Sequence, residues 1–549
     1  MKGMLRTGLL IAFASVTVLG SYAAGGAEAP AATPAAGRSG VVNPLGKDDP
    51  GQPMITMRIG AIDVDEAGFP PGMTRDQNVW TDLYRDVLGV EMQNAWVVPQ
   101  AQANERVNLQ IAAGDIPDLL RVNMSQFNQL VEYGLIADLS EVYETYATRL
   151  TRDVLESDGG IALSIASRQG NLYAIPYTSA IMNMTPVPWI RFDWLEKLGL
   201  EAPETTDELY EIVRAFVTQD PNGTGAADTI GFPMWAGNSI SNLAFEGLMT
   251  SFNAYPNKWV KASDGSLEFS AVSSNARDAL EYLRRAYADG LIPRDFGSWG
   301  DGQANEAIVA GRAGIFWWPW WAPYWMGASR DNDPTADWRP IYPPEGPNGT
   351  PRLSAGAVPG QFYAIRKGFA HPELIVKMTN LFFEMQQEEE NIVRYINGPD
   401  EENFWQFSKI IAWNGTGFID EHHNMVRAIA ERNRDLVAVG NRSRYDNVIR
   451  FLEGEEGEWR SYMAFGPRAT YGIYARAAET GNYEAGEYFE AGTPTMIDRG
   501  GDLDTILLEE YVRIVTGAPM TQFATMVQRW RNSGGTAVTN EVNDWYRNR

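Results

Sequence analysis

The segment Met54-Ile-Thr-Met-Arg-Ile-Gly-Ala-Ile62 alternates apolar and polar residues, a pattern typical of a β-strand. Residues 78–88 then have helical spacing that ends at Gly89, and residues 90–98 predict a second strand. The alternation continues with a helix over 103–112, a strand over 116–122 and a helix over 125–133. Strands that alternate with helices favour parallel βαβ units. The sequence therefore predicts an α/β fold.

The rest of the chain predicts longer amphipathic helices, at 206–218, 274–288, 372–390 and 506–516. Two stretches rich in proline and polar residues, 175–188 and 342–351, interrupt this pattern and indicate crossings between lobes. Ligands of open α/β sheets usually sit outside the carboxyl ends of the strands. We therefore expect two interleaved lobes with a hinge and a central cleft.

Composition limits the possible functions. The chain has 549 residues, of which 45 are basic and 70 acidic, giving a net charge of −25 with histidine neutral. This balance argues against nucleic acid as a partner, because nucleic-acid affinity rests on Lys and Arg. The chain has no cysteine, which excludes disulfides and cysteine-ligated metals. Its three histidines, His371, His422 and His423, lack the spacing of a zinc-protease helix.

The N-terminus has the pattern of a secretory signal peptide. Lys2 and Arg6 precede an apolar stretch that is too short to span a bilayer, so we assign residues 1–24 to a signal peptide. Residues 25–53 are rich in Ala, Gly and Pro and predict a flexible tether. Ser21 stands where a lipoprotein signal would carry the lipidated cysteine, so no lipid can attach there. The alternative is an N-terminal membrane anchor that is never cleaved.

Aromatic residues concentrate at 317–325, where five of the eighteen tryptophans lie together with Pro319 and Pro323. The prolines predict a loop rather than a regular helix or a central strand. An indole face can stack on a sugar ring while its N–H donates to a hydroxyl. The candidate ligand contacts are Trp317, Trp318, Trp320, Trp321, Trp325, Trp235, Tyr177 and Trp405, and further rings are Trp413 and Trp459. The alternative is that several of these rings pack in the core.

Residues 220–229 resemble the first part of a calcium loop. Oxygen-bearing positions alternate with glycines, and the candidate ligands are Asp220, Asn222, Thr224, the carbonyl of Ala226, and Asp228. Position 229 is threonine, so the loop lacks a bidentate closing carboxylate. The alternative is a solvated turn.

Catalytic motifs are not evident. The sequence has no Gly-x-Ser-x-Gly elbow, no Walker loop and no His-Glu-x-x-His motif. Acidic runs such as 388–390 and 453–456 indicate solvated faces. A pair of catalytic carboxylates remains open, because seventy acidic residues supply many candidates.

Several short motifs, in this order and spacing, resemble the extracellular solute-binding proteins of bacterial ABC importers, in particular the sugar-binding family and its long branch with the alginate-binding proteins. The motifs are Ala113-Gly-Asp-Ile-Pro-Asp118, Gly134-Leu-Ile-Ala-Asp-Leu139, Gly170-Asn-Leu-Tyr-Ala-Ile-Pro176, residues 190–200, Ala310-Gly-Arg-Ala-Gly314 and the end of the chain from Gly534. The resemblance covers almost all of the chain after the predicted signal peptide.

This resemblance implies a periplasmic-binding-protein fold of type II, which closes on an oligosaccharide by hinge bending and docks on a membrane permease. We expect residues 54–178 and 350–400 to form the N-terminal lobe, and 179–349 and 401–549 to form the C-terminal lobe. The resemblance also implies a structural calcium ion in the 220–228 loop, although Thr229 replaces an acidic ligand of that branch.

The resulting hypothesis is a monomeric, non-enzymatic receptor, exported to the periplasm or cell exterior and associated with the membrane, that delivers a carbohydrate to an ABC importer. The tryptophan cluster and the acidic balance favour a neutral oligosaccharide, because an anionic sugar needs several converging Arg or Lys residues. Two alternatives stay open at this stage. One is a secreted glycan hydrolase or lyase with a carboxylate pair, and the other is a receptor for a peptide or an anionic compound.

Overall fold

The first body of the protein is built on a five-stranded sheet. The computed structural model describes residues 42–63, 68–99, 102–237, 239–356, 360–399 and 403–549. The sheet order is β2-β1-β3-β13-β6, with β1 (Ile55–Asp63), β2 (Val90–Pro99), β3 (Leu119–Asn123), β6 (Ile175–Pro176) and β13 (Gln361–Ile365). β1 is parallel to β2 and β3, whereas β13 is antiparallel to β3 and β6. The predicted α/β class and the parallel pairing of the first strands are confirmed.

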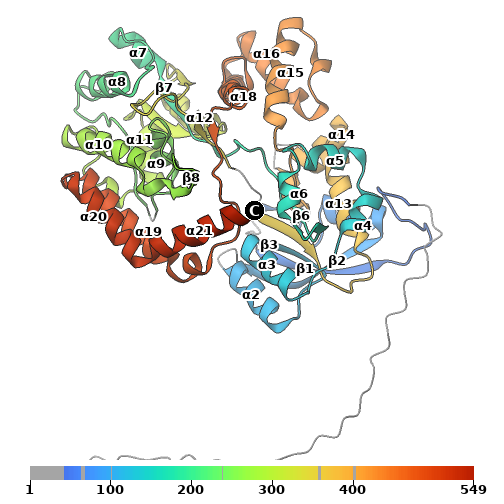
Figure 1. Ribbon diagram of the computed structural model, residues 1–549. Helices are drawn as coiled ribbons and strands as arrows, with labels where there is room; N and C mark the ends of the chain where they lie inside the picture. The colour runs from blue at the N-terminus through green and yellow to red at the C-terminus, as the bar shows by residue number, and fades with distance from the viewer. Residues whose placement is uncertain (1–41, 64–67, 100–101, 238, 357–359, 400–402) are drawn as a thin grey trace, which may run out of the picture. The chain divides into compact units, whose positions relative to one another are not determined.

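Helices from two parts of the chain, residues 79–165 and 373–391, belong to the same body as the sheet. They are α1 (Val79–Leu83), α2 (Ala103–Ala113), α3 (Met124–Glu132), α4 (Ser140–Tyr146), α5 (Arg149–Leu155), α6 (Ile161–Ile165), α13 (Glu373–Glu384) and α14 (Glu389–Asn391). Figure 1 shows α13 beside α4 and α5, although more than two hundred residues separate them in sequence. Local sequence sets the helix ends: the Asn78 side chain caps α1, and Gly89 ends the following turn in the left-handed conformation.

The core of this body joins distant parts of the chain. Its buried residues come from 55–175, 362–396 and 410–412. Trp80 is fully buried, and its indole N–H donates to the carbonyls of Tyr395 and Phe404 at 2.8 and 3.0 Å. The chain therefore leaves this core after β6, builds other structure, and returns through β13.

Residues at the start of the described chain are also held on this body. Lys377, which lies in α13, donates from Nζ to the carbonyl of Gly46 and to Asp48 Oδ1, both at 2.8 Å. Asn380 donates to the carbonyl of Pro44 at 2.8 Å. The part of the predicted tether that the structure describes is thus hydrogen-bonded at residues 44–48, while residues 1–41, including the predicted signal peptide and Ser21, lie outside the described residues.

A second sheet has the order β10-β7-β11 and is antiparallel throughout, with β7 (Val187–Arg191), β10 (Ile315–Trp318) and β11 (Trp338–Pro340). One core adjoining it involves α7 (Phe192–Leu198), α8 (Thr206–Thr218), α9 (Leu243–Thr250), α10 (Ser274–Ala288), α11 (Asp301–Val309), α19 (Pro494–Val515), α20 (Thr521–Trp530) and α21 (Thr536–Asn548). Another involves α12 (Ala322–Asn332), α15 (Gly417–Glu431), α16 (Arg442–Leu452), α17 (Trp459–Phe465) and α18 (Thr470–Thr480). Short ladders pair β4 (Ser167–Arg168) with β5 (Asn171–Leu172), β8 (Trp259–Lys261) with β9 (Leu267–Phe269), and β12 (Leu353–Ser354) with β14 (Tyr483–Glu484).

The prediction that residues 317–325 form a loop is wrong for most of that stretch. Trp317 and Trp318 end β10, which is an edge strand, and α12 begins at Ala322. Pro323 fits there because the N–H groups of a first helical turn have no partner within the helix. Only residues 319–321 connect the strand to the helix.

Residues 342–351 were predicted to cross between the lobes, but the chain crosses after this segment. Asn253 donates from Nδ2 to the carbonyls of Asn348 and Thr350 at 3.2 Å each, so this segment packs on residues that follow α9. The chain passes from the core around α12 to the core of the first sheet between Ala355 and Phe362. A turn rich in proline and glycine shows where a regular element ends, but not which surface the turn covers.

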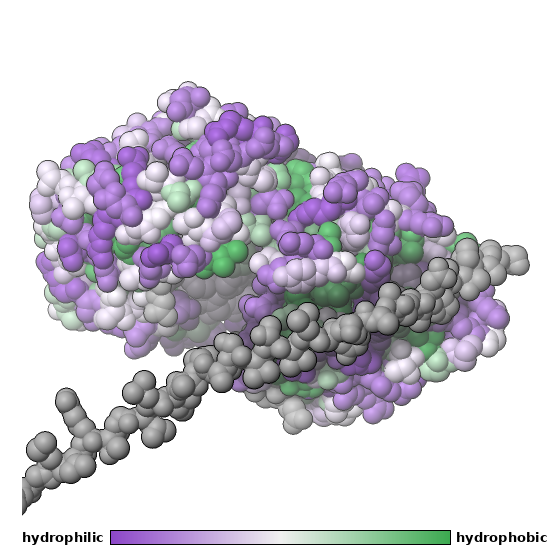
Figure 2. All heavy atoms as spheres, turned by 60° about the horizontal axis from the view of Figure 1, so that its bottom comes forward, coloured by the Kyte–Doolittle hydropathy of each residue, from purple (hydrophilic) through white to green (hydrophobic). Residues whose placement is uncertain are grey.

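The visible face in Figure 2 is dominated by hydrophilic residues, and hydrophobic residues appear on it as separated patches. Among the described residues, no helix is both long enough and apolar enough to cross a membrane.

Candidate ligand-binding site

Three segments that are far apart in sequence are joined by backbone hydrogen bonds. The N–H of Trp413 donates to the carbonyl of Thr178 at 3.0 Å. The N–H of Ile181 donates to the carbonyl of Gly415 at 3.0 Å. The N–H of Gly356 donates to the carbonyl of Ile181 at 2.7 Å. These bonds hold together the segments through which the chain passes between its cores.

A pocket of about 90 Å³ lies against these segments. Its lining includes Ser157, Asp158, Thr178, Ser179, Asn183, Gly356 and Gly415, together with the apolar side chains of Leu155, Ala162 and Met184. Met184 is 57% exposed at this site. Hydroxyl, carboxylate and amide groups beside an exposed apolar side chain can exchange hydrogen bonds with a polyhydroxylated ligand and contact its C–H groups.

The pocket is connected to the tryptophan-rich segment through Asn183. The indole N–H of Trp320 donates to Asn183 Oδ1 at 3.0 Å. The Trp320 ring also contacts Tyr324, Phe465 and Tyr471, with centroid separations of 6.3, 5.5 and 5.6 Å. Tyr324 is 43% exposed. Trp320 and Tyr324 together form what we call the aromatic wall.

Two other predicted contacts, Trp317 and Trp235, face the core. Trp317 is only 2% exposed, and its ring stacks on Phe232 with centroids 5.9 Å apart. Trp235 is 6% exposed and packs against Trp318. Both rings therefore belong to the hydrophobic core around α9 and β10 and offer no open face for stacking. The physical reason for Trp317 is that β10 lies between two cores, with Ile315 and Trp317 on one face and Phe316 on the other.

Trp318, Trp321 and Trp325 pack on one another in an edge-to-face group, with Trp318 lying 5.3 Å from Trp321 and 5.2 Å from Trp325 between centroids. The indole nitrogens of Trp317, Trp318 and Trp325 are buried and have no hydrogen-bond partner among the described residues. Edge-to-face packing brings positive ring edges to negative ring faces, which partly compensates such donors. These rings are half-buried or buried, so their main contacts are with each other.

The remaining predicted contacts pack on the core of the first sheet. The guanidinium of Arg121 lies over the Tyr177 ring, 4.9 Å from its centroid. Trp405 packs edge-to-face on Trp413 at 5.6 Å and donates from its indole to Asn403 at 3.3 Å. The candidate aromatic residues thus form two groups, one on this core and one near α12.

Several residues at the aromatic wall were not predicted from the sequence. Behind the wall, Arg444 pairs with Glu421 at 2.5 Å and lies 4.4 Å from the centroid of the Phe465 ring. Burial raises the pKa of the Tyr471 phenol, so the group stays neutral at physiological pH. Tyr324 lies in the aromatic stretch 317–325, so the composition of that stretch could have indicated Tyr324 as a candidate. No local pattern marks Asn183 or Arg444, which reach the wall only through the fold.

The 220–229 loop brings its oxygen atoms together. The carboxylate of Asp220 accepts from the backbone N–H groups of Thr224 and Gly225 at 3.2 and 3.0 Å. Asp228 accepts from Asn222 Nδ2 and from Thr224 Oγ1 at 3.0 Å each, and these bonds hold the pKa of Asp228 below its usual value. This set of oxygen donors is of the kind that calcium prefers.

The last position of the loop differs from a complete calcium loop. The hydroxyl oxygen of Thr229 is buried and has no hydrogen-bond partner among the described residues. An unpartnered buried hydroxyl is costly, and a cation bound in the loop would give this oxygen a partner if it reached the ion. The residues present fit a calcium ion bound by two carboxylates and neutral oxygens. Within the part of the chain that the structure describes, no cluster of three His, Cys, Asp or Glu residues could hold a metal.

The motifs and the two-sheet architecture can be compared with known proteins. Residues 94–389, more than half of the chain, match the model of the family described as bacterial extracellular solute-binding protein. The chain belongs to this family. The family match agrees with the resemblance of its sequence motifs. The family and the curated relative described next are solute-binding or substrate-binding proteins rather than enzymes.

A curated relative is the fructooligosaccharide ABC transporter substrate-binding protein FusA of Streptococcus pneumoniae serotype 4. The two are 31% identical over 212 residues, which is 36% of this chain and 39% of FusA. The chain thus matches about two fifths of the length of this relative.

Solved structures confirm the fold. An extracellular solute-binding protein from Bifidobacterium longum subsp. infantis aligns with a TM-score of 0.63 at 18% identity, covering 90% of this chain and 98% of that one. The alginate-binding protein AlgQ2, in a structure without calcium ion, aligns with a TM-score of 0.57 at 18% identity, covering 90% and 98%. Together with the two sheets described above, these alignments establish the two-lobed solute-binding-protein fold.

Proposed function

We propose that this protein is a non-enzymatic receptor that captures a neutral oligosaccharide and delivers it to an ABC importer. The observation that carries the proposal is the aromatic wall of Trp320 and Tyr324, connected by Asn183 to a polar pocket in a chain of the solute-binding family. The fructooligosaccharide specificity given in the name of FusA supports a sugar ligand.

Local charge favours a neutral ligand. Arg444, the cation behind the wall, is neutralised by Glu421 at 2.5 Å. The pocket lining contains one carboxylate, Asp158, and no Lys or Arg. An anionic sugar would need unpaired cations at the wall or in the pocket to replace its lost hydration. Hydroxyl and amide groups next to aromatic rings suit a neutral sugar instead.

The proposed mechanism is closure around the ligand. The chain crosses between its cores in three segments that backbone hydrogen bonds hold side by side. Small changes in the backbone dihedral angles of these segments would therefore move the two lobes together, as in a hinge. A sugar that contacts residues on both sides of the crossing binds the closed state more tightly than the open state, and this difference shifts the population. The closed protein then presents the surface that a permease recognises, and it acts as a monomer.

The domain bounds belong to the same proposal. The lobes are residues 54–178 with 350–400, and 179–349 with 401–549, preceded by a signal peptide at 1–24 and a tether at 25–53, which ends on α13 through the hydrogen bonds of residues 44–48. Buried residues of the first core at 55–175 and 362–396 support the first lobe, and residues 410–412 of the same core extend this lobe beyond residue 400. The family description, an extracellular solute-binding protein, supports export to the periplasm or the cell exterior, and Ser21 would leave the protein without a lipid at that position.

The proposed calcium ion would be held by Asp220, Asn222, Thr224, the Ala226 carbonyl and Asp228, with Thr229 as a further oxygen donor. The convergence of these oxygens and the buried hydroxyl of Thr229 support it. A bound cation would fix the loop after α8 by neutralising its two carboxylates. The ion has a structural role in this proposal and takes no part in ligand chemistry.

Calorimetry with a panel of neutral and uronate oligosaccharides tests the function. We expect saturable binding of a neutral oligosaccharide and a loss of about tenfold or more in affinity in Tyr324→Ala, because an aromatic contact is removed. Tyr133→Ala is the matched control, since Tyr133 is a 59% exposed tyrosine at the end of α3. Absence of saturable sugar binding would refute the proposal. The release of reducing ends from oligosaccharides would instead support a hydrolase, and the appearance of unsaturated products would support a lyase.

A further inference from the structure

A second and larger hollow lies in the body that contains α12, α16 and α17. Its volume is about 400 Å³, within the range of small-ligand sites. It is lined by Arg330, Arg339, Arg468, Phe451, Trp459 and Tyr462, among others. It shares no lining residue with the pocket at the crossing segments. We call it the arginine hollow.

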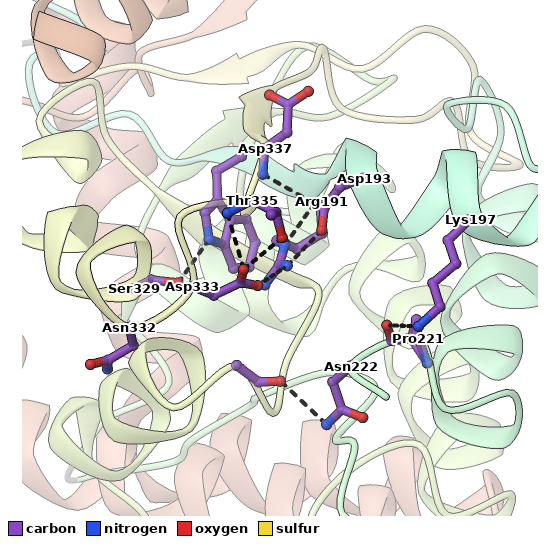
Figure 3. Close-up of polar contacts among 12 residues, drawn as sticks. Arg191, Asp193, Lys197, Pro221, Asn222, Ser329, Asn332, Asp333, Thr335 and Asp337 are labelled. Atoms are coloured by element: carbon purple, nitrogen blue, oxygen red, sulfur yellow. Dashed lines mark hydrogen bonds and ion pairs between the residues drawn. The ribbon is translucent and has the colours of Figure 1, made fainter. Parts of the chain in front are cut away.

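One wall of the arginine hollow is fixed by a buried arginine (Figure 3). Arg191 is 2% exposed and donates to both oxygens of Asp193 at 2.7 and 2.6 Å, and to Asp333 at 2.7 Å. Thr335 Oγ1 donates to Asp333 at 2.6 Å, and the N–H of Asp337 donates to Asp193 at 3.1 Å. Thr335 and Asp337 line the hollow, so this network holds the wall in one conformation.

Aromatic rings supply an apolar surface. Phe451 and Tyr462 stack with their centroids 4.6 Å apart and their planes 28° apart. The guanidinium of Arg330 lies over Trp459 at 5.0 Å from the ring centroid. Rings fixed by stacking can receive the flat face of a ligand without loss of side-chain entropy.

The charge of the hollow opposes that of the whole chain. Three arginines line it against two carboxylates, Asp337 and Glu456, whereas the chain as a whole carries a net charge of −25. Arg330 pairs with Glu456 at 3.0 Å, and Arg339 pairs with Asp337. Arg468 is exposed and has no ion-pair or hydrogen-bond partner among the described residues. Its guanidinium is therefore available to an anion.

We propose that the arginine hollow binds a small aromatic carboxylate. Arg468 would pair with the carboxylate in the bidentate geometry that guanidinium favours, and the ring would lie against the half-buried Phe451 or Tyr462. This site is separate from the proposed sugar site and does not depend on it.

Ligand-detected NMR with the full chain tests the proposal, with 1-naphthoate as the probe and 1-naphthalenemethanol as its neutral counterpart. We expect saturable binding of 1-naphthoate, weaker binding of the alcohol, and a loss of about tenfold or more in naphthoate affinity in Arg468→Gln. The Arg468 side chain is exposed and makes no ion pair or hydrogen bond among the described residues, so the variant is expected to fold. Arg149→Gln is the matched control, because the Arg149 side chain is 94% exposed on α5.

Three results would overturn the proposal. The first is no saturation of the 1-naphthoate signal up to about 10 mM, a concentration that corresponds to very weak binding. The second is equal affinity for the acid and the alcohol, which would make the site purely apolar. The third is an Arg468→Gln affinity equal to that of Arg149→Gln, which would place the carboxylate elsewhere.

Discussion

Replacing the buried arginine of Figure 3 should be among the more costly single changes in this protein. Arg191→Met removes three charge-assisted hydrogen bonds and leaves the carboxylates of Asp193 and Asp333 without their shared cation. Breaking a buried ion pair on one side typically costs about 3–5 kcal/mol. The two carboxylates are 23% and 39% exposed, so water can partly replace the lost donors. We therefore expect a loss near the lower limit, about 3 kcal/mol.

Urea unfolding followed by circular dichroism measures this loss. With an m value of about 3 kcal/mol/M, the midpoint should fall by about 1 M. Arg277→Met is the control, because Arg277 lies on α10 and its ion pair with Asp278 is 47% and 32% exposed. An exposed pair of this kind contributes about 0–1 kcal/mol. If both variants unfold at the same urea concentration, the hydrogen-bond network of Arg191 does not stabilise the protein and the reasoning is wrong.

The same variant should change how stability depends on pH. Burial alone would raise the pKa of Asp333, but hydrogen bonds from Thr335 and Arg191 outweigh burial and lower it below its usual value. A lowered carboxyl pKa stabilises the fold above the unfolded pKa of about 3.9, and this stabilisation disappears as pH falls through the lower folded pKa. Acidification should therefore destabilise the wild type more than Arg191→Met. Parallel acid unfolding curves for the two proteins would contradict this account.

Two further predictions concern the calcium loop and the packing of β10. Calcium should raise the thermal midpoint of the protein, and Asp228→Asn should abolish the rise because it removes one of two carboxylates, whereas Asp264→Asn in an exposed turn should retain it. An unchanged midpoint in the wild type would exclude the ion. Gly247→Ala should cost about 1–3 kcal/mol, since an added Cβ would lie 2.3 Å from Trp317 Cβ. Gly302→Ala on α11 meets no atom within 4 Å and should be neutral or slightly stabilising, so equal melting of the two alanine variants would contradict the packing.

Local sequence predicted the first body well. The strand at 54–62 and the helix at 103–112 lie within about one residue of β1 and α2, because alternation and a terminal glycine are properties of the segment itself. The helix predicted at 506–516 begins much earlier, at Pro494, because the side chain of Thr493 caps it.

The candidate site was harder to predict. Tryptophan content drew attention to residues 317–325, but the core that Trp317 joins depends on which elements pack on each face of β10. Asn183 and Glu421 come to the aromatic wall from separate segments, so no spacing in the sequence could indicate them. The arginine hollow likewise joins residues 330–339 with 451–468 through tertiary packing.

The position of β13 in the first sheet also constrains how the chain folds. β3 pairs with β13 across more than two hundred residues, and the core beneath needs residues as late as 412. Closing a loop of that length slows folding, because its entropy is lost before the native contacts form. During synthesis, β3 has an open edge until residues 361–365 emerge, whereas the intervening β7–β10–β11 sheet is already complete. A nascent chain stalled before β13 should therefore be the species most prone to aggregate or to engage a chaperone.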